Sequence, residues 1–109
     1  MPFDEALALR VRATLGRLNG LSEKRMFGGL TFLLHGNMCV GVHGQELIVR
    51  LDPAQTEIAL AEPHTRVFDL SGRPMKGWIL VDPAGLANDA ALSKWLRRAT
   101  TYAASLPNK

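Results

Sequence analysis

The segment between residues 30 and 51 constrains the fold most strongly, because very short polar connections separate its apolar runs. The runs are "LTFLL" (30–34), "MCVGV" (38–42) and the apolar part of "QELIVRL" (45–51), and they are rich in strand-forming residues. The connections "HGN" (35–37) and "HG" (43–44) each contain a glycine. Connections this short join antiparallel neighbours, so the segment predicts three consecutive antiparallel strands.

Further strands are predicted on both sides of this segment. "KRMF" (24–27) precedes it, and "TRVFDL" (65–70) and "WILV" (78–81) follow, separated by an exposed loop, "SGRPMKG" (71–77). The glycine pair at 28–29 predicts a bulge or bent strand, because a phosphate-binding turn would require a helix to follow. Together these runs predict a sheet of about five or six strands.

Three helices complete the pattern. An N-terminal helix over 3–18 is predicted from apolar residues spaced three and four apart, namely Phe3, Leu7, Val11, Leu15 and Leu18. A short helix begins at "DPAQ" (52–55), and a long one runs from Leu86 or Asn88 to Ser105. The predicted fold is therefore a single α+β domain over 1–109, an antiparallel sheet with its N- and C-terminal helices packed on one face and the short helix between the strand groups.

Composition narrows the class of protein. The formal net charge of +3 is mildly basic and falls short of a nucleic-acid-binding tail. No apolar run approaches the ~18 residues that span a bilayer, and the acidic N-terminus does not resemble a secretory signal. The single cysteine, Cys39, excludes an intrachain disulfide. We therefore expect a cytoplasmic protein without a membrane partner.

Residues with catalytic or metal-binding chemistry do not form a recognisable pattern. His35 and His43 fall at opposite ends of one predicted strand, too far apart to bind one ion directly, and Cys39 is expected to be buried. His64 does not complete a spacing typical of metal ligands. The serines lie outside any G-x-S-x-G motif, which marks a nucleophile elbow. We expect no metal, no cofactor and no catalytic residue.

A basic and aromatic surface is the best candidate for a binding site. The loop "SGRPMKGW" (71–78) offers cations and an aromatic ring between two glycines, and strand arginines could share its face. The alternative is an ordinary loop whose Met75 and Trp78 dock into the core. The candidate binding residues are Arg25, Arg50, Arg66, Arg73, Lys76 and Trp78.

Three segments together resemble one family. "KRMFGGLTFLLHGNMCVGVHGQELIVRL", "GRPMKGWILVDP" and "LSKWLRRATTYAASLP" are similar, in this order, to the N-terminal domain of the TfoX/Sxy proteins, regulators of bacterial competence. The resemblance implies an α+β domain of helices against an antiparallel sheet. It also marks motif positions expected to serve folding: Met26, Phe27, Gly28, Gly29, Gly36, Met38, Gly72, Met75, Gly77 and Trp95.

Two functions remain open. The first is a non-enzymatic regulatory or interaction domain whose basic loop and sheet surface bind a protein or nucleic acid, with a link to transcription or DNA uptake implied by the resemblance. The alternative is a small-ligand or enzyme domain that holds an anion with Arg25, Arg50 and Lys76. Direct binding of nucleic acid is a weaker hypothesis, because the sequence contains no helix-turn-helix or zinc-finger spacing. The apolar runs further predict a homodimer formed through the sheet or an edge strand.

Overall fold

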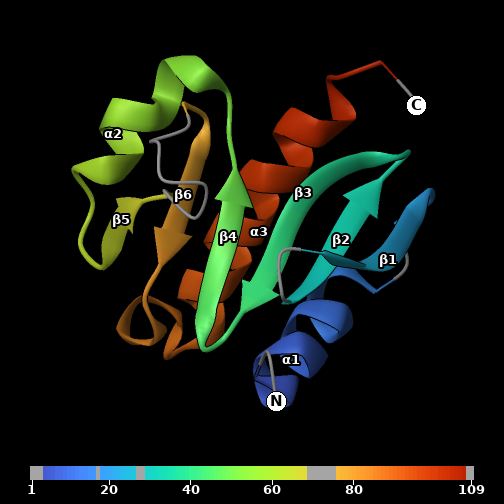
Figure 1. Cartoon of the computed structure of the whole chain (residues 1–109), viewed down its shortest axis with the longest axis horizontal. Coiled ribbons are helices and arrows are strands. Elements are labelled where there is room, and N and C mark those ends of the chain that lie inside the picture. The colour runs from blue at the N-terminus through green and yellow to red at the C-terminus, as the bar shows by residue number, and fades with distance from the viewer. Residues whose placement is uncertain (1–3, 17, 27–28, 69–75, 108–109) are drawn as a thin grey trace.

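The computed structural model describes residues 4–16, 18–26, 29–68 and 76–107, and within them the chain forms helices backing one sheet (Figure 1). The elements are α1 (Glu5–Leu15), β1 (Leu21–Met26), β2 (Gly29–Leu34), β3 (Asn37–His43), β4 (Glu46–Arg50), α2 (Thr56–Leu60), β5 (Thr65–Val67), β6 (Trp78–Val81) and α3 (Asp89–Ala104), with short 3₁₀ turns at Pro53–Gln55 and Pro83–Leu86. The predicted α+β fold is confirmed.

The six strands form one antiparallel sheet in the order β1-β2-β3-β4-β6-β5. Strands β1 to β4 follow one another directly, as their short connections require. The chain then passes through α2 to β5 at the far edge, and β6 returns between β5 and β4. The first strand is longer than the predicted "KRMF", while the predicted strand over 65–70 ends at Val67.

The main core lies between the sheet and the helices. Phe32, Val40 and Val49 are register partners on neighbouring strands, so they point to the same face. All three are fully buried in a cluster that includes residues from α1, α2 and α3. In Figure 1 the long helix α3 runs behind β3 and β4. Both terminal helices therefore pack on one face, as predicted.

Helix α1 is shorter than predicted. Asp4 caps its start by accepting hydrogen bonds from two backbone amides, and it ends at Gly16, whose φ of 38° breaks the helical path. Leu18 follows this break and is 42% exposed, so its assignment to the buried stripe was wrong. Phe3 lies outside the described residues.

A bulge lies in β3, opposite Phe32 and Leu33 of β2, whereas the sequence predicted a bulge or bent strand at residues 28–29. The register shifts beside Phe32, so Cys39 and Val40 both face the core, and the Cys39 thiol donates to the Phe32 carbonyl over 3.4 Å. Gly29 instead permits a close approach, because an added Cβ would lie 2.0 Å from the Val42 oxygen. Gly28 lies outside the described residues.

The opposite face of the sheet carries a second, smaller apolar cluster. Its members are Met38, Ile48, Phe68 and Leu80, with Trp78 partly buried against them. None of these residues comes from an α-helix, and we call this surface the helix-free face. Burial on both sides explains, within one chain, the continuous apolar runs from which a dimer was inferred. The homodimer itself stays a prediction.

Candidate functional site

Two of the predicted binding residues meet on the helix-free face. Arg50, the last residue of β4, is the register partner of Trp78, the first residue of β6. Opposite residues of an antiparallel pair share a face, so both side chains lie on the side that carries the second apolar cluster. The Trp78 ring also lies beside Phe68, with their centroids 5.6 Å apart.

The Arg50 guanidinium contacts two aromatic rings. Its central carbon is 5.3 Å from the Trp78 ring centroid and 5.7 Å from that of Tyr102 in α3. Its Nη1 also donates a long hydrogen bond, 3.5 Å, to the Met38 carbonyl. We call Arg50, Trp78, Tyr102 and the Met38 carbonyl the Arg50 cluster. Each cation–aromatic contact contributes about 0.5–2 kcal/mol, which holds the charged group in place.

The position of Arg50 explains how it reaches a helix on the other side of the sheet. Pairing between β3 and β4 begins at Val40 and Val49, so Arg50 lies just past the end of this ladder. There its side chain contacts both the helix-free face and Tyr102. Tyr102 falls within the long helix predicted to end at Ser105, and its contact with Arg50 could not be predicted from the sequence.

Gly77 fixes the start of β6 and with it the position of Trp78. Its carbonyl accepts a 2.6 Å hydrogen bond from the Leu51 amide, and its own amide donates to the Thr56 hydroxyl over 2.6 Å. Its φ is 87°, and an added Cβ would lie 2.7 Å from the Leu51 oxygen. Glycine is therefore required at this motif position.

The other predicted basic residues do not join the Arg50 cluster. Arg66 forms an ion pair with Glu46 and lies 3.8 Å from Asp82, so carboxylates already surround it. Lys76 is exposed and precedes β6 at the end where Arg50 lies. Arg73 lies outside the described residues, as do the motif residues Phe27, Gly72 and Met75.

Arg25 lies on the helix-covered side of the sheet. Its register partner is Leu30, a member of the main core. It lines a groove of about 320 Å³ between α1 and β1, beside Arg12 and Glu23. The expectation that Arg25 shares a sheet face with Arg50 was therefore wrong, and the anion site proposed from Arg25, Arg50 and Lys76 does not assemble.

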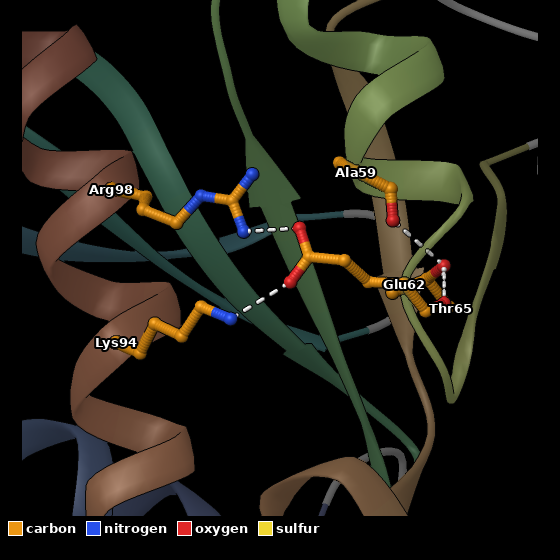
Figure 2. Close-up of polar contacts among 5 residues, drawn as sticks. All are labelled: Ala59, Glu62, Thr65, Lys94 and Arg98. Carbon is orange, nitrogen blue, oxygen red and sulfur yellow. Dashed lines mark hydrogen bonds and ion pairs between the residues drawn. The ribbon is translucent and has the colours of Figure 1, made fainter.

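An ion-pair network that the sequence did not predict joins Glu62, just after α2, to α3 (Figure 2). Glu62 accepts hydrogen bonds from Lys94 over 2.9 Å and from Arg98 over 2.7 Å. Nearby, the Thr65 hydroxyl donates to the carbonyls of Ala59 and Glu62. We call Glu62, Lys94 and Arg98 the Glu62 clamp. Lys94 and Arg98 follow Glu62 by 32 and 36 residues, so no local sequence pattern could predict these contacts.

Opposing effects set the pKa of Glu62. Burial raises this pKa, but the hydrogen bonds from Lys94 and Arg98, with their charges, outweigh the burial and leave the pKa below its usual value. The Arg98 guanidinium also lies 4.5 Å from the centroid of the buried Trp95 ring. The clamp therefore borders the main core, and its role is to hold the helical layer together.

The histidines and the cysteine are not gathered into a site. His35 and Gly36 form the turn before β3, both with positive φ, whereas His43 ends that strand. Burial raises the pKa of the Cys39 thiol to about 11, so it stays protonated at neutral pH. Across the described ranges, no three His, Cys, Asp or Glu side chains could share a metal ion.

The fold and this site define a class of protein, a small α+β domain with one helix-covered and one helix-free sheet face. A family model described as the TfoX N-terminal domain matches residues 13–103. The chain belongs to the TfoX N-terminal domain family. No curated protein and no solved structure matches it. Within the described part of the chain, no helix is long and apolar enough to cross a membrane.

Proposed function

We propose that this protein is a non-enzymatic regulatory domain that binds a protein partner with its helix-free face. The observation that carries the proposal is the Arg50 cluster, in which a half-buried guanidinium contacts the Trp78 ring on that face and the Tyr102 ring of α3. Arginine and aromatic side chains contribute most to binding energy at protein interfaces. The rings also hold Arg50 in one position, which lowers the entropy lost on binding.

The chemistry of the cluster suits binding better than catalysis. It contains no carboxylate, imidazole or thiol that could accept a proton or attack a substrate near neutral pH. The Cys39 thiol is fully buried on the other side of the sheet. Family membership adds support for a regulatory role linked to transcription or DNA uptake, by similarity to the competence regulators of the TfoX/Sxy family.

A protein partner is favoured over direct binding of nucleic acid. Several arginines already pair with carboxylates inside the chain, including Arg12 with Glu23 and Arg98 with Glu62. Such pairing removes charge that would otherwise contact phosphates. We therefore place the regulatory effect in contacts with another protein.

The test compares chromosomal alleles in the source bacterium. We expect Arg50→Gln to reproduce the transcript profile and DNA-uptake phenotype of a deletion strain, at unchanged protein level. Arg97→Gln is the matched control, because Arg97 is an exposed arginine on α3 that lines a groove beside α1. An Arg50→Gln strain that behaves like the wild type would contradict the proposal, as would a deletion without any regulatory effect.

A further inference from the structure

We propose that the Arg50 cluster recognises a carboxylate, supplied by an acidic side chain in an exposed segment of the protein partner. This inference rests on the proposed function and names the chemistry of the partner at that same site. It starts from a difference between Arg50 and other arginines of the chain. Arg12, Arg66 and Arg98 each form an ion pair with a carboxylate from elsewhere in the fold.

Arg50 is half-buried, yet no carboxylate of the described residues lies within ion-pair distance of it. Its charge is permanent, because a guanidinium does not deprotonate in proteins. A charged group that is partly removed from water is stabilised by a partner of opposite charge. The two rings and the Met38 carbonyl supply part of that stabilisation and leave further N–H groups able to donate.

The geometry of these contacts favours a planar acceptor. A guanidinium has five N–H donors in one plane, and among the described residues only Nη1 of Arg50 has an acceptor, at a long 3.5 Å. A carboxylate can accept two parallel hydrogen bonds from such a group, in the bidentate arrangement that arginine forms most strongly. The Trp78 and Tyr102 rings would flank the methylene groups of an aspartate or glutamate side chain.

The same contacts disfavour phosphate. The cluster contains one positive charge, which matches a carboxylate and leaves a phosphate dianion uncompensated. Aromatic surfaces beside the guanidinium are poor surroundings for so strongly hydrated an anion. The Met38 carbonyl oxygen, which points toward Nη1, adds a partial negative charge that repels a dianion more than a monoanion. We therefore assign the site to a carboxylate.

The test is an NMR titration of the whole chain that follows the Arg50 Nε–H resonance. The probe is the peptide acetyl-Gly-Glu-Glu-Gly-amide, compared at equal ionic strength with its Gln-Gln counterpart and with sodium phosphate. We expect a saturable shift with the glutamate peptide, none with the glutamine peptide, and at least about tenfold weaker binding of phosphate. Arg97→Gln should bind like the wild type.

A conservative variant protects the test against misfolding. Arg50→Lys keeps the positive charge and a long aliphatic stem but loses the planar fork, and we expect it to bind the glutamate peptide about tenfold more weakly, followed by the Trp78 indole resonance. The proposal is overturned if the wild type shows no saturable shift, if Arg50→Lys binds equally well, or if phosphate binds more tightly. If the titration is negative but the Arg50→Gln strain still has a regulatory defect, the carboxylate assignment is wrong. The proposed function is then unaffected.

Discussion

Replacing each of the two tryptophans by alanine should have very different effects on stability. Trp95 is 4% exposed in the main core, and its ring lies 4.5 Å from the Arg98 guanidinium and 5.8 Å from the Lys94 amine. Trp78 is half-buried at the start of β6, against the smaller cluster and beside Phe68. The two residues have the same side chain, so the comparison isolates the environment.

The magnitudes follow from burial. Truncating a buried tryptophan lowers the free energy of unfolding by about 3–5 kcal/mol. The loss for Trp95→Ala should lie at the upper end of this range, because the substitution also removes the contact with Arg98. Trp78→Ala removes a partly buried side chain, one aromatic pair and the contact with Arg50, and should lower the free energy of unfolding by about 1–2 kcal/mol. The free energy of unfolding of a small domain is about 5–15 kcal/mol, so Trp95→Ala removes a large share of the stability.

Urea unfolding followed by far-ultraviolet circular dichroism measures this difference. With a urea dependence of roughly 1–1.5 kcal/mol per molar, the midpoint should fall by about 3 M for Trp95→Ala and about 1 M for Trp78→Ala. Trp95→Phe serves as a control that keeps an aromatic ring and should lose less than Trp95→Ala. Equal midpoint losses for the two alanine variants would refute the assignment of Trp95 to the core and Trp78 to its margin.

Four further predictions concern other parts of the fold. Glu62→Gln should lower the free energy of unfolding by about 1 kcal/mol at neutral pH, because the clamp loses the negative charge that pairs with Lys94 and Arg98. The pKa of Glu62 is lowered in the folded state, so its contribution is present above the ordinary value of 4.5 and disappears as the pH falls through the folded value; urea midpoints of wild type and variant should converge in acid. Gly77→Ala should cost about 2 kcal/mol in the same assay, since a positive φ and the nearby Leu51 oxygen both oppose a side chain. Cys39 should react with a thiol reagent only after unfolding, because it is buried and its pKa is raised to about 11; rapid labelling of the native protein would contradict this. Sedimentation equilibrium at micromolar concentration should show twice the 11.9 kDa chain mass, and a clean monomer would end the predicted homodimer.

Local patterns in the sequence predicted most of the fold. The two short turns around β3 determine the antiparallel order, and the apolar spacing of α3 places Leu92, Trp95 and Leu96 in the core. The end of α1 was harder to predict, because the helical periodicity of leucines continues past Gly16 to Leu18 although the backbone turns away.

Contacts between distant segments could not be predicted in the same way. The Arg50 cluster joins β4, β6 and α3, and the two aromatic partners follow Arg50 by 28 and 52 residues in the sequence. Arg25 and Arg50 look equivalent as strand arginines. Only the strand register shows that they belong to opposite faces, because a shift of one residue reverses the side to which a side chain points.

Site-specific photo-crosslinking in living cells of the source organism tests the central claim most directly. A benzoylphenylalanine residue replaces either Lys76, which is exposed two residues before Trp78, or Arg97, which is exposed on α3. The helix-free face is the binding surface if the probe at Lys76 gives a discrete, nuclease-resistant protein adduct that Arg50→Gln abolishes, while the probe at Arg97 does not. An adduct only at Arg97, or one at Lys76 that persists in the Arg50→Gln background, would contradict it.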